Sequence, residues 1–344
     1  MKRRIFLLPI EPLEERYSAD WLRWWPAGLR PMGDGMADAS LEVVVVLGHQ
    51  NTREIETGQF LDAVDTMRFK ATQADAMLAR VQAGQVGDDD IILMLDGWNP
   101  AVEMLHYARV LTGAKWKLAG LLHAGTWDSH DHLSRCGLEP SMRGAEQGWA
   151  KMFDRLYVAT EFHKRLLAGA ALDVSRTKVL PFPLLTGHLK LCHATPWSDR
   201  GNLVVFPHRL APEKNPSMFE EMARAYRAKY PEDSAEFVCS KYAARTKADY
   251  YNLLGRARVA VSCAYQETWG IAMLESLALG AHPVAPARLS YPETMPADAL
   301  YTSMNSAIEL IHRGLHAQSP AHEPEILARY QRAFPAFIND LENL

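Results

Sequence analysis

Short runs rich in β-branched residues and leucine alternate with longer segments of helical periodicity along the chain, and this alternation restricts the fold more than any other feature. In the first half, strands are predicted at 4–9, 41–48, 90–95, 116–122 and 155–159, and helices over 14–29, 58–83, 101–112, 144–153 and 161–169. In the second half, strands are predicted at 202–206, 236–239, 258–263, 282–285 and near 300, and helices over 215–229, 247–255 and 271–279. Strand–helix alternation of this kind predicts α/β architecture, with parallel sheets covered by helices on both faces.

The length and a group of helix-breaking residues divide this pattern into two domains. A chain of 344 residues suits two domains of ordinary size, and prolines and glycines gather between 181 and 201. We therefore predict two doubly wound, Rossmann-like domains that face each other across a cleft, over 1–190 and 191–324, with a last helix at about 325–344 that packs back on the first domain. Ligands of such domains bind at the carboxyl ends of the strands.

The composition argues against several classes of protein. Hydrophobic residues make up 48% of the chain and charged residues 23%, which excludes global disorder. The apolar stretch at 5–10 is short and is predicted to be a first strand rather than a signal peptide, and no run approaches the ~20 apolar residues of a membrane span. Four scattered cysteines predict reduced thiols and a cytoplasmic location. A net charge of −4 gives no support to nucleic acid as a bulk electrostatic partner, although 151–200 hold a local excess of Lys and Arg.

Two cations follow the first strand of the second domain. Arg209 and Lys214 lie between the strand at 202–206 and the helix predicted from 215. A guanidinium fork and an ammonium group in such a turn can clamp a diphosphate. Taken alone, however, such a pair is more often two ordinary surface charges on a solvated loop.

The segment after a later strand carries a stronger signal. Glu267 and Glu275 are separated by seven residues, and Gly270 permits a tight loop before the predicted helix. The amino end of that helix, at Gly270 and Ile271, would direct backbone N–H groups at a phosphate. Glu275 lies in an apolar stretch that should be buried, so it needs a polar partner. Carboxylates accept hydrogen bonds from paired sugar hydroxyls, and two at this spacing can hold two different sugars.

Together, the Arg-x4-Lys pair and the Glu-x7-Glu pair about 55 residues later resemble the retaining glycosyltransferases of the GT-B fold, of the family 4 type. The resemblance implies a hexosyltransferase that uses a UDP- or GDP-sugar as its donor. It implies that Arg209 and Lys214 bind the donor diphosphate, that Glu275 binds the nucleotide ribose, and that Glu267 lies against the transferred sugar. Because the paired cations already neutralise the diphosphate, we predict no metal ion at this site and no other cofactor.

A narrower resemblance covers about residues 203–305. The segments 207–209, 270–275 and 289–297 are similar to the tRNA-queuosine mannosyltransferase branch, whose members glycosylate a modified nucleoside. The amino-terminal half departs from that branch, since 11–18 lack the Gly-Gly-rich loop expected after the first strand. The acceptor therefore stays open between a tRNA nucleoside, a hydroxymethylpyrimidine of phage-type DNA such as hydroxymethylcytosine, and a small-molecule, lipid or polysaccharide hydroxyl.

The first domain offers candidate groups after its strand at 116–122. His123 matches a histidine that the family often carries at this strand end, close to the reacting sugar. Asp128 is predicted to contact or deprotonate the acceptor hydroxyl because it lies close to His123 in the sequence. His130, Asp131 and His132 are predicted to begin a helix, with Asp131 as cap or first-turn charge, and a metal site is the alternative.

Residues after the first strand give a weaker hint of an acceptor site. The spacing of Trp21, Trp24 and Trp25 is typical of a helix stripe that faces the core. The alternative is a platform for an acceptor base, to which Arg16 and Trp24 would contribute.

The basic residues of 151–178 likewise cover solvated helix faces or follow a phosphate backbone. An epimerase, a phosphorylase and a non-catalytic nucleotide-sugar-binding module share the architecture and remain alternatives.

Overall fold

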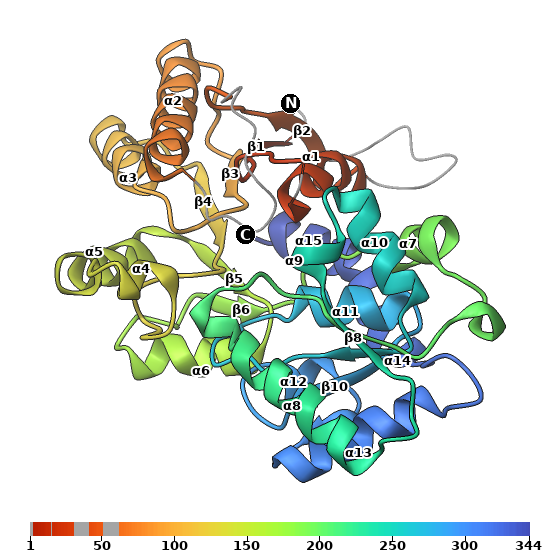
Figure 1. The fold of residues 1–344 in the computed structure, drawn as a ribbon. Coiled ribbons are helices and arrows are strands. Elements are labelled where there is room, and N and C mark those ends of the chain that lie inside the picture. The colour runs from red at the N-terminus through yellow and green to blue at the C-terminus, as the bar shows by residue number, and fades with distance from the viewer. Residues whose placement is uncertain (1–2, 15, 31–40, 51–61) are drawn as a thin grey trace.

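Two parallel sheets, one in each half of the chain, organise the molecule (Figure 1). The computed structural model describes residues 3–14, 16–30, 41–50 and 62–344. In the first sheet the strand order is β2-β1-β3-β4-β5-β6, and in the second it is β11-β10-β9-β7-β8. The strands are β1 (Arg3–Leu8), β2 (Leu41–Val45), β3 (Ile91–Met94), β4 (Lys117–Leu121), β5 (Arg155–Val158), β6 (Thr177–Val179), β7 (Leu203–Phe206), β8 (Glu236–Cys239), β9 (Val259–Val261), β10 (His282–Pro286) and β11 (Leu300–Tyr301). The predicted class, α/β with two Rossmann-like sheets, is confirmed.

Both faces of the first sheet are covered. Ile5 and Leu7 of β1 join the core beneath α1, whereas Phe6 and Leu8 join the core beneath α2, α3 and α5. Successive side chains of a strand point to opposite faces, so a strand buried on both sides is apolar at every position. The helices of this half are α1 (Tyr17–Gly28), α2 (Ala63–Gln82), α3 (Ala101–Thr112), α4 (His132–Arg135), α5 (Glu139–Met152) and α6 (Glu161–Gly169).

The second sheet is built in the same way. Val204 and Phe206 of β7 pack with α8 and α13, whereas Val205 belongs to the core shared with α10, α11 and the first sheet. One continuous apolar core thus joins the two halves. The helices of this half are α7 (Thr186–His193), α8 (Pro216–Lys229), α9 (Ser240–Ala243), α10 (Lys247–Arg256), α11 (Ile271–Ala278), α12 (Tyr291–Thr294), α13 (Met304–Leu315), α14 (Pro324–Gln331) and α15 (Ala333–Glu342).

The structure differs from the sequence prediction at several elements. The edge strand β6, the helix α7 inside the predicted linker, and α13 were not predicted. Helix α5 begins at Glu139, five residues before the predicted start, and the predicted start of the second helix at 58 lies outside the described residues. The β6 strand and the α7 helix are short and carry too few periodic positions to be identified locally, whereas the twelve residues of α13 carry an apolar stripe that local periodicity could have indicated.

The last helix lies against the first sheet. Asp340 of α15 accepts a hydrogen bond from the hydroxyl of Tyr157 at 2.8 Å and forms ion pairs with Lys178 at 2.6 Å and Arg155 at 3.0 Å. The ring of Phe337 packs edge-on against Trp25, with centroids 4.9 Å apart. The end of the chain therefore contributes to the core of its beginning, while the domain boundary near 190 stays a prediction.

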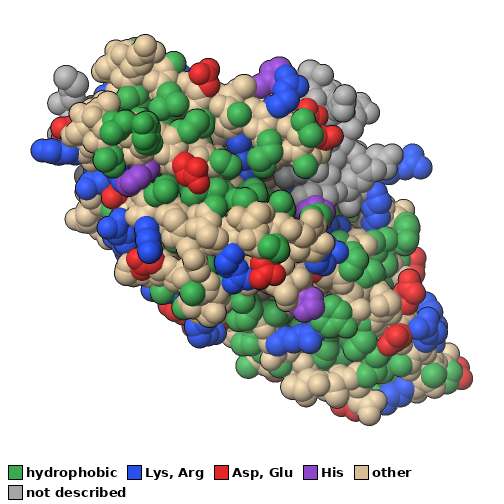
Figure 2. Space-filling model, turned by 90° about the vertical axis from the view of Figure 1, so that its left-hand side faces the viewer, with side chains coloured by type: hydrophobic (Ala, Val, Ile, Leu, Met, Phe, Trp, Pro, Cys, Tyr) green, Lys and Arg blue, Asp and Glu red, His purple; other side chains and the backbone are tan. Residues whose placement is uncertain are grey.

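One face of the first half carries exposed apolar side chains. Figure 2 looks at this face, and hydrophobic side chains gather in its upper part, where α2 and α3 lie. They include Val64 of α2 and Tyr107, Val110 and Leu111 of α3, all more than 60% exposed. Within the described part of the chain, no helix has the length and apolar character of a membrane span.

Candidate active site

Lys214 and Glu267 form the centre of the candidate site. Lys214 follows β7 and is buried, and its ammonium group lies 3.2 Å from Oε2 of Glu267, in the loop after β9. The same ammonium donates to the backbone oxygen of Gln266 at 2.7 Å. Burial opposes the ionisation of Glu267, but Lys214 and other neighbours hold its pKa below the usual value. Two strands that are neighbours in the sheet thus bring a cation and a carboxylate to one point at their carboxyl ends.

His208 lies beside this pair. Burial and the charge of Lys214 lower its pKa to about 3, and the charges of Arg209 and Glu267 also act on it. It is therefore a neutral imidazole at neutral pH. Its Nε2 is buried and has no hydrogen-bond partner among the described residues. His208 was not among the predicted site residues, although its position directly after a buried strand could have indicated it.

Arg209 is held by a buried acid from its own turn. Its guanidinium binds Oε1 of Glu213, and Oε2 of Glu213 accepts from Arg135 of the first half at 2.7 Å. Burial opposes the ionisation of Glu213, but Arg209 and Lys214 hold its pKa below the usual value. Glu213 therefore positions the guanidinium of Arg209 beside Lys214. It also binds the guanidinium of Arg135, which belongs to the first half. Neither Glu213 nor Arg135 was predicted, because their pairing spans 78 residues.

Glu275 has the polar partners that its burial requires. It is 2% exposed, and its carboxylate accepts from the hydroxyls of Tyr250 and Tyr251, each at 3.0 Å. Lys247 of the same helix, α10, lies 3.3 Å away. Tyr250 also contacts the backbone oxygen of Pro207 at 3.4 Å, next to His208. Burial raises the pKa of both tyrosines, so they stay protonated and donate to the carboxylate.

The loop before α11 depends on one glycine. Gly270 caps α11 in the left-handed region at φ +84°, which residues with a Cβ rarely adopt. The backbone N–H of Trp269, one residue before it, donates to Oε1 of Glu267 at 3.4 Å. The turn therefore binds the Glu267 carboxylate and presents the first N–H groups of α11, beginning with Ile271, at the same end of the sheet.

His123 faces this group from the first half. Its Nε2 lies 2.8 Å from the backbone oxygen of Leu95, which can only accept, so Nε2 carries the proton. Burial lowers the pKa of His123, and the ring is therefore neutral with an acceptor lone pair on Nδ1. The hydroxyl of Thr268, next to Glu267, donates to the backbone oxygen of His123 at 3.0 Å. The backbone carbonyl of Thr268 accepts from the hydroxyl of Thr160 at 2.8 Å. Thr268 thus fixes the strand end that carries His123 against the Glu267 loop.

Helix α1 completes the facing wall. The ring of Tyr17 lies 6.1 Å from those of both His123 and Trp269. Burial and Asp96 raise its pKa, and the charges of Arg209 and Glu267 also act on it. The preceding Arg16 is half-buried, and burial and the charge of Arg209 lower its pKa. The start of α1 therefore faces the residues predicted to bind the donor.

The tryptophans of α1 belong mainly to the core. Trp21 and Trp25 are fully buried, and Trp24 is half-buried and packs against the same core. This arrangement favours the core interpretation of their spacing over a stacking platform. Arg16 and Trp24 were predicted to contribute to one acceptor site, but they have different surroundings. Arg16 is close enough to Arg209 for their charges to interact, whereas Trp24 packs on the core.

Asp128 lines a cleft between the halves. The cleft has a volume of about 330 Å³, and Thr126 to His130, Phe162 and Leu166 of the first half face Tyr265 and Leu289 of the second. The rings of His130 and Tyr265 stack across it with centroids 5.6 Å apart. Burial raises the pKa of Asp128, while the charge of Lys214 acts in the opposite direction. Asp128 is therefore within electrostatic reach of the Lys214–Glu267 pair and open to a molecule in the cleft.

The neighbouring polar residues form a helix start, as predicted. Asp131 caps α4, and its carboxylate accepts from the backbone N–H of Leu133 at 2.9 Å. His132 contacts Cys136 one turn later.

Several basic residues of 151–178 are bound to protein groups: Arg155 and Lys178 to Asp340, Arg165 to Glu293, and Arg176 to backbone oxygens. In Figure 2 positive and negative side chains are interspersed on this side of the molecule.

Comparison with solved structures defines the fold. Sucrose-phosphate synthase from Thermosynechococcus elongatus superimposes with a TM-score of 0.62, 13% identity, and coverage of 98% of this chain and 94% of that one. HepE from Anabaena, in complex with UDP and glucose, gives a TM-score of 0.55, 13% identity and coverage of 99% and 95%. The chain has the GT-B fold. The N-terminal domain of Candida albicans trehalose-6-phosphate phosphatase is similar as well, with a TM-score of 0.62, 11% identity and coverage of 100% and 97%.

Similarity in sequence to a curated relative is local. No protein-family model matches the chain. The tRNA-queuosine alpha-mannosyltransferase of Drosophila melanogaster is 34% identical over 64 residues, which is 19% of this chain and 17% of that protein. The similarity thus spans about one sixth of the relative's length, and it is the fold that these comparisons establish.

Proposed function

We propose that this GT-B protein is a retaining glycosyltransferase that moves a hexose from a UDP- or GDP-sugar to an acceptor hydroxyl. The observation that supports it best is the joining of Lys214 to Glu267 at 3.2 Å, with Arg209 aligned beside them by Glu213. A cation pair, a sugar-binding carboxylate and a helix amino end at one edge of a sheet suit a nucleoside diphosphate sugar.

The donor would lie across the carboxyl ends of the second sheet. Arg209, Lys214 and the first amides of α11 take its diphosphate, and Glu275 takes the ribose hydroxyls. Glu267 takes hydroxyls of the hexose. Glu275 and Glu267 suit these roles because both are oriented by neighbouring donors before any ligand binds. Arg16 is assigned to the donor side as well, since its charge interacts with that of Arg209.

The reaction breaks the bond between the anomeric carbon and the diphosphate oxygen and forms a bond to the acceptor oxygen on the same face. Arg209 and Lys214 stabilise the negative charge that develops on the leaving diphosphate. Loss of one such preorganised group commonly lowers the rate by about 10²–10³. The lone pair on Nδ1 of neutral His123 accepts from a hexose hydroxyl and orients the ring.

The acceptor would enter the cleft at Asp128. Its carboxylate receives the proton of the acceptor hydroxyl, and its raised pKa makes it a stronger base than an exposed aspartate. The aromatic side chains of Tyr265 and Phe162 at this cleft suit a flat ring, so a modified nucleobase bearing a hydroxyl is the proposed acceptor. A small-molecule acceptor is the second candidate, because protein carboxylates already neutralise Arg155, Lys178 and Arg165.

Transfer assays with labelled donors test both the proposed transferase activity and the proposed nucleobase acceptor. Radiolabelled UDP-glucose and GDP-mannose are incubated with hydroxymethylcytosine DNA, plain DNA, tRNA and a small-molecule extract. We expect label in one acceptor fraction, retention of the anomeric configuration, and loss of transfer in Glu267→Ala but not in the distant Lys229→Ala. Label confined to the small-molecule fraction would overturn the nucleobase acceptor and leave the transferase. Donor that is bound but never transferred, or merely epimerised, would overturn the transferase itself.

A second variant tests the acceptor side separately. Asp128→Asn should lower the rate of transfer about 10²-fold or more, as expected for a lost general base, while UDP or GDP binding by calorimetry stays unchanged. Equal transfer by this variant and the wild-type protein would remove Asp128 from the mechanism.

A further inference from the structure

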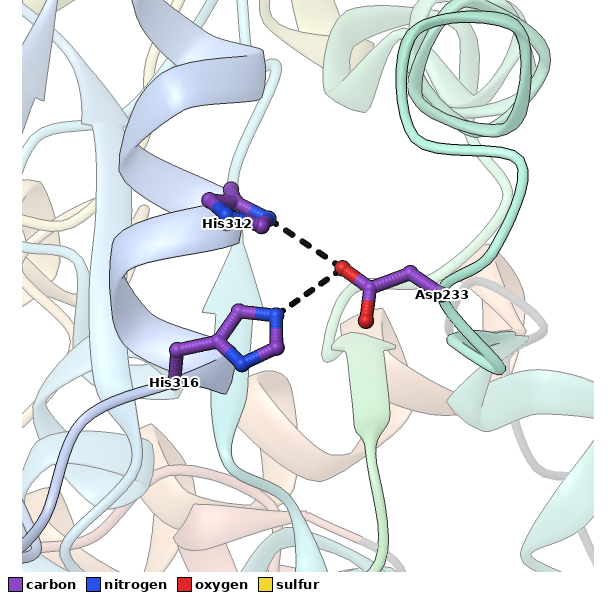
Figure 3. Close-up of side chains that lie close together, drawn as sticks. All are labelled: Asp233, His312 and His316. Carbon is purple, nitrogen blue, oxygen red and sulfur yellow. Dashed lines mark hydrogen bonds and ion pairs between the residues drawn. The ribbon is translucent and has the colours of Figure 1, made fainter.

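Two histidines and an aspartate converge on the far side of the second half, at the amino ends of its strands (Figure 3). His312 and His316 lie one turn apart at the end of α13, and Asp233 lies in the turn between α8 and β8. One ligand atom from each lies within 4.8 Å of the other two. The candidate active site is at the opposite, carboxyl edge of the same sheet, so the cluster is separate from it.

The geometry of the cluster fits a metal ion. Oδ2 of Asp233 lies 3.1 Å from Nδ1 of His312 and 2.9 Å from Nε2 of His316. Ligands bound at 2.0–2.2 Å in a tetrahedral site are about 3.4 Å apart, so each of these two distances would lengthen by only a few tenths of an ångström around an ion. The same Oδ2 also accepts from the hydroxyl of Tyr226 at 2.5 Å. Nδ1 of His312 also lies 3.2 Å from the hydroxyl oxygen of Tyr226, so the three candidate ligands and this tyrosine form one polar cluster.

Neighbouring residues hold two of the three ligands in place. The ring of Tyr230 stacks on that of His312 with centroids 3.9 Å apart and planes at 8°. The hydroxyl of Tyr226 orients Asp233 through its hydrogen bond to Oδ2. Metal ligands in proteins are commonly fixed by such outer contacts. The side chains of His312 and His316 are 36% and 50% exposed, which leaves water access for the remaining coordination position.

We propose that Asp233, His312 and His316 bind one zinc ion that ties the α8–β8 turn to the end of α13. Two imidazoles and one carboxylate form the ligand set that zinc accepts, whereas calcium and magnesium prefer oxygen ligands alone. His312 lies in the last turn of α13 and His316 caps the end of this helix four residues later, a spacing that recurs in zinc sites on helices. The role is structural, and it does not depend on the proposed transferase activity. This site was not foreseen from the sequence, where a metal was considered only at 130–132.

Zinc titration of untagged, chelator-treated, full-length protein tests the site, with affinity measured in competition against a chromophoric chelator. We expect one zinc ion per chain and a higher thermal midpoint when zinc is bound. His316→Ala and Asp233→Asn should each weaken binding at least about tenfold. His316 is half-exposed, so its variant should keep the wild-type circular dichroism spectrum.

Two matched variants separate this site from other histidines and thiols. His322→Ala removes an exposed histidine outside the cluster, and Cys136→Ser with Cys192→Ser removes the two His–Cys pairs on α4 and α7. Both should bind zinc as the wild-type protein does, and Co²⁺ should give the intense visible absorption of a tetrahedral site unless His316 is replaced. The absence of stoichiometric zinc, or wild-type affinity in both His316→Ala and Asp233→Asn, would overturn the proposal.

Discussion

Replacing Lys214 by alanine separates its structural contribution from its part in the proposed reaction. The buried ammonium contacts Glu267 at 3.2 Å and the backbone oxygen of Gln266 at 2.7 Å. Removing it leaves Glu267, whose side chain is 14% exposed, without its cation. The loss of a hydrogen-bonded charge pair at this degree of burial should lower the free energy of unfolding by about 2–3 kcal/mol. The loss of charge stabilisation at the leaving diphosphate should lower kcat by about 10²–10³.

A double variant distinguishes the two effects. Lys214→Ala with Glu267→Gln removes both charges, so most of the stability should return because no unpaired carboxylate remains. Transfer should stay at least about 10²–10³ below that of the wild-type protein, since the diphosphate still lacks its cation. Stability is measured by urea denaturation, and transfer by release of labelled hexose at a temperature where every variant is folded.

The control is Lys229→Ala, which breaks an exposed pair with Glu309 at 3.1 Å. It should change stability by less than about 0.5 kcal/mol and leave transfer unchanged. Near wild-type activity in Lys214→Ala would refute the assignment of this lysine to the diphosphate. A double variant as unstable as the single one would refute the argument about the unpaired carboxylate.

Three further changes test other parts of the structure. Gly270→Ala should lower the free energy of unfolding by about 1–2 kcal/mol because of its positive φ, and so should Gly137→Ala at φ +80°, but only the former should weaken calorimetric binding of UDP or GDP. Burial raises the pKa of Asp131 to about 6, so the folded protein binds more protons than the unfolded chain between pH 4 and 6, and stability should fall as pH rises through this window. Asp131→Asn keeps the cap of α4 and should remove up to about 3 kcal/mol of this pH dependence, as measured by urea denaturation at several pH values. An unchanged variation of the free energy of unfolding with pH would contradict the raised pKa of Asp131. Asp340→Asn leaves Arg155 and Lys178 without their carboxylate and should cost about 2 kcal/mol in the same assay, whereas Asp298→Asn at an exposed pair should cost almost nothing.

Much of the fold could be predicted because its signal is local. Alternating apolar strands and amphipathic helices identified most elements and the two-sheet class, since side-chain periodicity follows directly from backbone geometry. The strand-end rule also selected Arg209, Lys214 and Glu267 at the edge of the second sheet, and His123 at the edge of the first. The α7 helix and the β6 strand escaped because they are short and lie among breakers, whereas α13 has twelve residues with an apolar stripe at Ile308, Ile311 and Leu315 that could have been predicted.

The sequence by itself determined the order of elements, the turn residues after each strand and the need of Glu275 for polar partners. Only the tertiary structure decided what those partners are, for example that Tyr250 and Tyr251 bind Glu275 and that Glu213 joins Arg209 to Arg135. It also brought Asp233 to His316 over 83 residues of chain. Such contacts depend on how helices pack on a sheet, and packing between distant segments leaves no periodic trace in the sequence that a local pattern could reveal.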